Sequence, residues 1–338
     1  MRAFFDQDQL LHRPLTRLAG GELRPTVETP ERAEYLLAAL RSAQVEIAAP
    51  GAYPDEHIAR IHCADYLDFL RDGFQEWSKH PGNGREMRAS AHPVRAQARV
   101  PRDILGRAGY FQADASCVLM AETWQAARAS AMTALASVDH VLQTGKLAYG
   151  LCRPPGHHAA RDLAGGFCYL NNSAIAAEMA VAQGLRVAIL DVDVHHGNGT
   201  QALFYDRDDV LTVSLHGAPE DLYPFYSGYA DETGAGPGEG RNLNLPLPLM
   251  SGLETWEAAM NSARSAIRAF GPDLVVIALG LDAFVNDPFA CMALETDDFA
   301  RLGALSRFTC PAVVIQEGGY PTEALGPNLL RFIDGLAG

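Results

Sequence analysis

The amino-acid sequence predicts an α/β fold, in which a mostly parallel central sheet is covered by helices on both faces. Three observations lead to this prediction. Residues 186–190 and 274–279 are short, nearly continuous apolar runs, as in strands buried on both faces. Such runs alternate with segments of helical spacing. The 338 residues are 48% hydrophobic and contain no evident linker, so we expect one domain over residues 1–338 with a large core.

The first part of the chain is predicted to be helical up to a long loop. Thr29 and Pro30 are start signals for a helix over residues 31–43, and residues 66–77 carry apolar side chains at helical spacing. Residues 79–106 contain several Pro, Gly and Arg residues and no sustained apolar period. This stretch is longer than most connections in compact domains, so we expect an inserted loop that wraps a site or a partner, or that is disordered.

From residue 123 the sequence resumes with a helix and then alternates strand and helix to its end. The expected strands cover residues 147–151, 186–190, 210–215, 274–279 and 312–316, and the expected helices cover residues 123–141, 172–182, 200–205, 253–270, 297–308 and 325–336. In open parallel sheets the functional residues gather at the C-terminal ends of the strands. We therefore expect the functional residues to lie just after the predicted strands.

Composition and charge argue against several classes of protein. The sequence has no run of about 18 apolar residues and no basic leader, so we expect a soluble, cytoplasmic protein that does not enter a membrane. A formal net charge of −14 argues against nucleic acid as the main partner. The cysteines form no Cys-x-x-Cys pair and indicate ordinary thiols in a reducing compartment.

The strand over residues 186–190 leads directly into a set of potential metal ligands. Asp191, Asp193 and His195 lie on alternate residues and therefore share one side of the extended chain. Carboxylate and imidazole suit Zn²⁺ or a similar divalent ion. Asp282, just after the strand over residues 274–279, adds a carboxylate and leaves coordination positions for water and substrate. The alternative is that these residues only end strands and cap the segments that follow.

Two further strand ends carry residues suited to proton transfer and oxyanion stabilisation. His157 and His158 follow a Pro-Pro-Gly turn, and imidazole exchanges protons near neutral pH, so we expect general acid and base catalysis on a metal-activated water. The alternative is a buried histidine pair with satisfied hydrogen bonds. Tyr320 follows two glycines and can donate its hydroxyl to a developing oxyanion, although a lone tyrosine is more often a packing residue.

Taken together, these motifs resemble the histone deacetylase and acetylpolyamine amidohydrolase family, which is related to the arginase-like ureohydrolases. The resemblance runs through almost the whole chain. It implies a three-layer arginase/deacetylase-like fold and a zinc-dependent amidohydrolase acting on a non-peptide amide C–N bond. The matching motifs lie at residues 21–23, 30–34, 153–158, 165–172, 191–199, 280–282 and 317–320.

The resemblance also implies a role for each site residue. One Zn²⁺ per subunit is expected on Asp193, His195 and Asp282. The reaction is expected to use His157, His158 and Tyr320, with Asp191 behind His157 and Asn198 behind His158.

A structural K⁺ is a further implication of the resemblance. It is expected near the backbone of the Asp191 segment, with Ser214 and Leu215, and a second monovalent site is expected near Phe204 and Val210.

Comparison with the ureohydrolases argues for one catalytic metal rather than two. A binuclear manganese enzyme of that type would need a carboxylate two residues after His195 and another two residues after Asp282. Those positions hold Gly197 and Phe284, so a mononuclear zinc amidase is favoured.

The resemblance places several residues along the substrate channel. Phe167 and Tyr223, with Gly166 beside them, match positions that line the family's narrow channel for an unbranched chain. Residues 79–106 resemble a loop that joins two subunits and narrows the entrance in acetylpolyamine deacetylases. This implies a homodimer, or a dimer of dimers, acting on small molecules.

The entrance departs from the pattern of polyamine-specific relatives. Arg17, Leu105 and Ser116 stand where acidic residues are expected, and Arg17 would repel a diamine unless Glu22 or Asp103 supplies a compensating charge.

Four readings of the function follow. An N-acetylated polyamine or another N-acyl amine is the first substrate hypothesis, and a small uncharged N-alkyl amide, for instance a xenobiotic, is the second. Protein lysine deacetylation is the third. A noncatalytic protein that binds zinc or an acetylated amine is the alternative to an enzyme.

Overall fold

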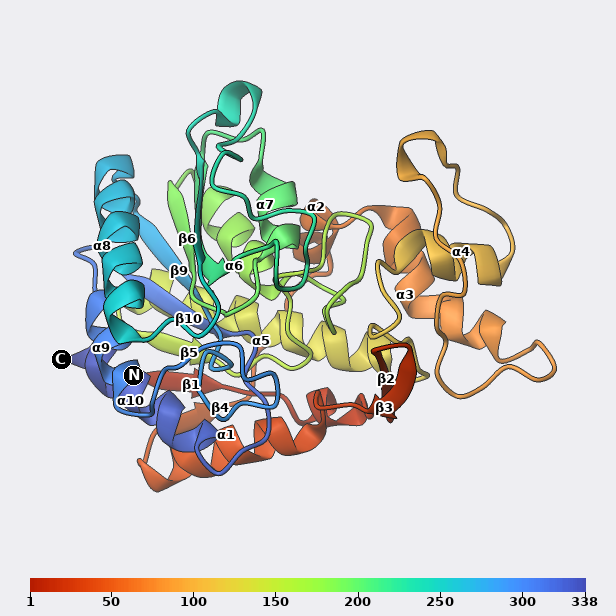
Figure 1. The fold of residues 1–338 in the computed structure, drawn as a ribbon, viewed down its shortest axis with the longest axis horizontal. Coiled ribbons are helices and arrows are strands. Elements are labelled where there is room, and N and C mark those ends of the chain that lie inside the picture. The colour runs from red at the N-terminus through yellow and green to blue at the C-terminus, as the bar shows by residue number, and fades with distance from the viewer.

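The computed structural model describes all 338 residues and is built around one eight-stranded sheet (Figure 1). Its strands are β1 (Arg2–Phe4), β4 (Glu46–Ala48), β5 (Ala148–Gly150), β6 (Val187–Asp191), β7 (Val210–Gly217), β8 (Asn242–Leu247), β9 (Leu274–Leu279) and β10 (Ala312–Gln316). They lie in the order β4-β1-β5-β10-β9-β6-β7-β8, and every neighbouring pair is parallel. The predicted α/β fold is confirmed.

Helices cover both faces of this sheet (Figure 1). They are α1 (Pro30–Ser42), α2 (Glu56–Ile61), α3 (Ala64–Trp77), α4 (Ile104–Phe111), α5 (Thr123–Thr144), α6 (Asn172–Val181), α7 (Asn198–Phe204), α8 (Leu253–Phe270), α9 (Asp298–Leu305) and α10 (Leu325–Ala337). Residues of α1, α8, α9 and α10 share one hydrophobic core, and residues of α3, α4, α5 and α6 share the other. None of these helices combines the length and apolar composition needed to cross a bilayer.

Alternate residues of the central strands point into the two different cores. In β6, Ala188 and Leu190 belong to the core under α8, whereas Val187 and Ile189 belong to the core under α6. Full burial of a Val, Leu or Ile side chain stabilises the folded state by roughly 1.5–3 kcal/mol relative to leaving it exposed. The continuous apolar runs of the sequence therefore mark strands that are buried on both faces.

The structure also contains short elements that the sequence analysis does not predict. These are β1, β4, β8, α2, α4 and a hairpin of β2 (Thr16–Ala19) and β3 (Glu22–Pro25). The predicted loop over residues 79–106 ends too late, because residues 104–106 already form the first turn of α4. Before α4 this stretch holds a short 3-10 helix, Arg95–Gln97, and an isolated antiparallel bridge between Met87 and Leu119.

The hairpin is separate from the central sheet. Its two strands pair antiparallel with each other and with no strand of the eight-stranded sheet. Gly20 and Gly21 form its turn with φ of +60° and +80°, a conformation that favours glycine.

Candidate active site

Two carboxylates and a histidine meet where β6 and β9 end. Asp193 and His195 follow β6, and Asp282 follows β9, its neighbour in the sheet. One ligand atom of each lies within 4.8 Å of the other two, and all three residues are buried. His195 Nδ1 lies 3.2 Å from Asp193 Oδ1 and 3.1 Å from Asp282 Oδ2. The fold thus brings the three predicted zinc ligands to one point.

The surroundings of this ligand cluster fit a divalent cation. Burial, together with the charge of Asp193, raises the pKa of Asp282, because two buried carboxylates side by side are costly without a counter-charge. A cation removes that cost, and two carboxylates with an imidazole nitrogen suit Zn²⁺. Glycines let the backbone approach the cluster closely: a Cβ at Gly280 would lie 2.3 Å from Asp193 Oδ2. A Cβ at Gly318 would lie 2.3 Å from an oxygen of each carboxylate.

The adjacent histidines lie beside the cluster and are each held by one hydrogen bond. His157 Nδ1 lies 2.9 Å from Asp191 Oδ2, and His158 Nδ1 lies 2.7 Å from Asn198 Oδ1. The two ring centroids are 4.0 Å apart. The structure therefore shows both predicted pairs, and in each pair the Nε2 atom of the ring is left for other contacts.

Carboxylate and amide partners give the two rings opposite protonation tendencies. Burial lowers the pKa of His157, but the charges of Asp191 and Asp193 outweigh burial and raise the pKa to about 10. Burial, followed by the charges of His157 and His195, lowers the pKa of His158 well below its usual range. The partner of His158, Asn198, is a neutral amide that cannot stabilise a cationic ring as the Asp191 carboxylate does for His157, which is consistent with the lower pKa of His158.

Tyr320 is buried and fixed from two sides. Its backbone N–H donates to Asp287 Oδ2 at 2.9 Å, and the Arg32 guanidinium carbon lies 5.3 Å from the centre of its ring. Burial raises the pKa of Tyr320 well above its usual value, so the hydroxyl keeps its proton. Asp287, whose pKa is raised to about 7 by burial and the charge of Asp282, and Arg32 are supporting residues that the sequence analysis misses.

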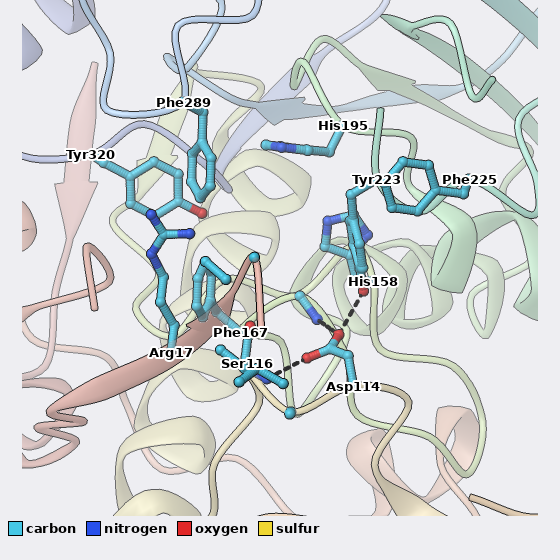
Figure 2. A pocket seen from close by; sticks show the side chains of 15 residues that line it. Arg17, Asp114, Ser116, His158, Phe167, His195, Tyr223, Phe225, Phe289 and Tyr320 are labelled. Carbon is cyan, nitrogen blue, oxygen red and sulfur yellow. Dashed lines mark hydrogen bonds between the residues drawn. The ribbon is translucent and has the colours of Figure 1, made fainter. Parts of the chain in front are cut away.

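A cavity of about 470 Å³ opens onto these groups (Figure 2). Aromatic rings form much of its wall, and the hairpin turn closes one side. His158, His195 and Tyr320 reach it, whereas Asp193 and Asp282 lie beneath. The lining residues are Arg17, Leu18, Ala19, Gly20, Asp114, Ala115, Ser116, His158, Gly166, Phe167, His195, Tyr223, Phe225, Phe289 and Tyr320.

Comparison with known proteins identifies the family of this chain. Its residues 26–336 match the histone deacetylase domain. The chain belongs to the histone deacetylase family.

Relatives within this family cover the chain from end to end. Acetylpolyamine amidohydrolase 1 of Pseudomonas aeruginosa is 42% identical over 344 residues, which cover 100% of this chain and 99% of that protein. An acetylpolyamine amidohydrolase of Burkholderia pseudomallei is 43% identical over 337 residues, with 99% and 98% covered.

Solved structures of the family have the same fold. A crystal structure of acetylpolyamine aminohydrolase from Burkholderia pseudomallei superimposes with a TM-score of 0.94 at 42% identity and covers 100% of this chain and 98% of that one. The HDA15 HD domain gives a TM-score of 0.83 at 28% identity, with 99% and 88% covered. As a member of this family, the chain is a hydrolase that acts on amide bonds.

The histone deacetylase family fold places most of the predicted channel residues in the cavity. Phe167, Gly166, Tyr223 and Arg17 line it (Figure 2). Leu105 does not line it; its side chain lies on α4 and is 47% exposed.

The two carboxylates expected to compensate Arg17 lie outside the cavity. Glu22 is exposed and pairs with Arg24 at 3.5 Å. Asp103 caps α4 by accepting a hydrogen bond from Leu105 N at 2.8 Å. Within one chain, neither of them therefore supplies charge to the cavity.

A carboxylate that the sequence analysis misses, Asp114, organises one wall of the cavity. Its Oδ2 accepts hydrogen bonds from Tyr223 Oη and from Gly166 N, both at 2.8 Å, and its Oδ1 accepts from Ser116 N at 2.8 Å and Cys117 N at 3.1 Å. Both oxygens are thus already engaged by the protein.

Glu317 belongs to the motif at residues 317–320, but the sequence analysis assigns it no role. It lies just after β10, and its Oε2 accepts hydrogen bonds from Gly156 N at 2.6 Å and His157 N at 3.0 Å. Its Oε1 accepts from Ser173 Oγ at 2.7 Å. This buried carboxylate therefore fixes the backbone that carries the histidine pair. Its position at a strand end is the signal that could have revealed it.

The segment proposed for K⁺ contains a small polar pocket. Asp191 and Ser214 are partners across β6 and β7 and both line it, whereas Leu215 does not. Gly197, also in its lining, has no room for a side chain, because a Cβ there would lie 2.3 Å from Asp191 Oδ2. A carboxylate for a second catalytic metal does not fit at that position.

Proposed function

We propose that this chain is a zinc-dependent amidohydrolase that removes the acyl group from an N-acylated small amine. The observation that carries the proposal is that His195 of the ligand cluster, His158 and Tyr320 face one cavity. Membership of the histone deacetylase family supports the reaction class. The names of the relatives make acetylpolyamines the first substrates to test.

Asp193, His195 and Asp282 would hold the zinc ion. When bound, zinc supplies Lewis-acid chemistry, which lowers the pKa of a water molecule and polarises the amide carbonyl. Proton transfer and stabilisation of the carbonyl oxygen are carried out by side chains of the protein.

His157 and His158 move the protons. His158 faces the cavity with Nδ1 tied to Asn198, so its Nε2 is directed to the reactants. His157 lies behind it, and the Asp191 carboxylate stabilises its cationic form. Together the two rings take a proton from the attacking water and return one to the leaving amine.

Tyr320 stabilises the oxygen of the scissile carbonyl. Its hydroxyl stays protonated and donates a hydrogen bond as negative charge develops on that oxygen. The contacts to Asp287 and Arg32 hold the tyrosine in place before substrate arrives.

Acetate release from N-acetylputrescine and from N-pentylacetamide by zinc-loaded protein tests this function. We expect hydrolysis that chelation abolishes and added zinc restores, and a loss of turnover by orders of magnitude in His158→Ala with its zinc content unchanged. A zinc-replete protein that is inactive on a broad panel of small amides would instead support a noncatalytic binding role.

A small uncharged amide is the second candidate substrate. The cavity lining offers no carboxylate free to bind an ammonium group, because Asp114 is fully engaged by the protein and Glu22 and Asp103 lie elsewhere. Protein lysine deacetylation ranks third, because the stretch over residues 79–106 is expected to narrow the entrance.

We also propose how the molecule is assembled. The chain forms one domain with residues 79–106 as an inserted loop, and this loop joins two subunits. Exposed apolar side chains within it, Val94, Val100 and Leu105, support a partner surface. We further propose that a structural K⁺ binds in the pocket lined by Asp191 and Ser214 within each chain.

A further inference from the structure

One guanidinium in the active-site cavity has no hydrogen-bonding or ion-pair partner in the protein. Arg17 and Asp114 are the Arg and Asp side chains of the lining, and only Asp114 is hydrogen-bonded. The side chain of Arg17 forms no hydrogen bond or ion pair, and its Nε is buried without an acceptor. Because a buried donor without a partner costs free energy, such a group in a binding cavity indicates that a ligand supplies the acceptor.

The guanidinium is directed toward the reacting groups. Its carbon lies 5.3 Å from the centre of the Phe289 ring, and Figure 2 shows the side chain extending from the hairpin toward Phe289 and Tyr320. The Phe289 ring in turn lies 5.0 Å from that of Tyr320 and 5.4 Å from that of His195. Phe289 therefore contacts Arg17 on one side and Tyr320 and His195, two residues of the proposed reaction centre, on the other.

The backbone that carries Arg17 is held firmly. Glu86 Oε1 accepts hydrogen bonds from Leu15 N at 2.6 Å and Thr16 N at 3.2 Å, and Arg88 donates to the carbonyl oxygen of Thr16 at 3.2 Å. The residue next to Arg17 is therefore anchored before any ligand binds. Such preorganisation reduces the entropy lost when the guanidinium engages a ligand.

We propose that Arg17 binds a carboxylate at the far end of the substrate, so that the preferred substrates are N-acyl amines whose chain ends in an anionic group. The planar guanidinium matches a carboxylate with two parallel hydrogen bonds. A terminal ammonium at the same place would be repelled by Arg17, and the carboxylate oxygens of Asp114 in the lining are already occupied by hydrogen bonds from the protein. The inference rests on the proposed amidohydrolase function and narrows its substrate class.

A matched series of three acetamides tests the inference. N-acetylputrescine, N-pentylacetamide and 5-acetamidopentanoate share one acetyl group and one methylene chain, and differ only in a terminal ammonium, methyl or carboxylate. We expect kcat/KM of the zinc-loaded protein to be highest for the carboxylate and lowest for the ammonium compound.

Variants of the hairpin test whether Arg17 causes the preference for the carboxylate compound. In Arg17→Gln we expect kcat/KM for 5-acetamidopentanoate to fall about tenfold or more, with little change for N-pentylacetamide. In Arg17→Glu we expect the order of the charged compounds to reverse. Arg24→Gln is the matched control, because Arg24 is the cross-strand partner of Arg17 and lies outside the cavity. It removes the same charge from the hairpin and should preserve the order.

Binding of the three compounds, measured by calorimetry on the same proteins, separates this inference from the proposed function. If none is hydrolysed but the carboxylate compound binds best and only through Arg17, the amidohydrolase proposal fails and the binding of a terminal carboxylate by Arg17 stands. If hydrolysis occurs with N-acetylputrescine preferred, or if Arg17→Gln and Arg24→Gln behave alike, the inference is overturned. Equal binding of all three compounds overturns it as well.

Discussion

The hydroxyl of Tyr320 is expected to matter for the chemical step and for nothing else in the molecule. Tyr320→Phe keeps the ring contacts to Phe289 and Arg32 but removes the hydrogen bond to the carbonyl oxygen. Loss of one such donor typically lowers turnover by about 10²–10³. Steady-state kinetics with metal analysis should show this loss at unchanged zinc content. Tyr226→Phe, at a ring that is 93% exposed, is the control, and equal turnover of both variants would exclude the proposed role.

Single residues differ in how far the sequence reveals them. Asp193, His195 and Asp282 directly follow buried strands, so alternation and fold class suffice to predict that they meet. Asp114 and Arg32 carry no such signal. Asp114 acts through Tyr223, 109 positions along the chain, and Arg32 looks like an ordinary residue of an amphipathic helix until the packing of that helix is known.

His62 connects the end of α2 to the loops around the histidine pair, and it makes these connections only when it is neutral. Its Nδ1 lies 2.9 Å from the Ala160 carbonyl oxygen, and its Nε2 accepts a hydrogen bond from Asn171 N at 3.0 Å. Burial lowers its pKa to about 4 from the usual 6.5. Protonation of Nε2 removes the acceptor that Asn171 needs.

This arrangement predicts acid-sensitive stability. Between about pH 6.5 and 4 the unfolded chain binds a proton at His62 that the folded protein excludes, so the free energy of unfolding falls as the pH decreases through this range. Across this pH range, the exclusion of the proton from His62 lowers the free energy of unfolding by about 3 kcal/mol. Denaturant titrations across this range should give a shallower pH dependence for His62→Gln than for the exposed control His80→Gln. Equal slopes for the two variants would contradict the prediction.

Elements differ in predictability for physical reasons as well. The strands β6, β9 and β10 are buried on both faces and read as apolar runs, and α8 has one apolar stripe, so sequence pattern predicts all of them closely. The three-residue strands β1 and β4 are too short to show a period. The hairpin strand β3 is exposed along its whole length, so no burial pattern reveals it.

At the scale of the whole molecule, a zinc ion would join the ends of β6 and β9. We expect zinc-loaded protein to unfold at a higher temperature than chelated protein, since a ligand that binds only the folded state stabilises it by mass action. Scanning calorimetry of Asp282→Asn should show a much smaller shift on zinc addition. The same shift in wild type and variant would show that zinc binds elsewhere.

The proposed dimer makes a second prediction at this scale. Val94 is 79% exposed, and a charge placed there would be buried by a subunit contact. Val94→Asp should therefore shift the mass measured by light scattering from dimer toward monomer. Tyr226→Asp, at another exposed site, should leave it unchanged. A monomeric wild-type protein would rule out the proposed dimer.

The hairpin at residues 16–25 is structurally separate from the residues proposed for catalysis, and this separation has a consequence for the evolution of the protein. The residues proposed for bond cleavage follow strands of the central sheet, where a change disturbs a common core, whereas the hairpin pairs with no strand of that sheet. Selectivity can therefore be inherited separately from reactivity. Substitutions in this hairpin would change which amides the protein accepts and leave the residues proposed for bond cleavage in place. Exchanging the hairpin between relatives would test this in the laboratory.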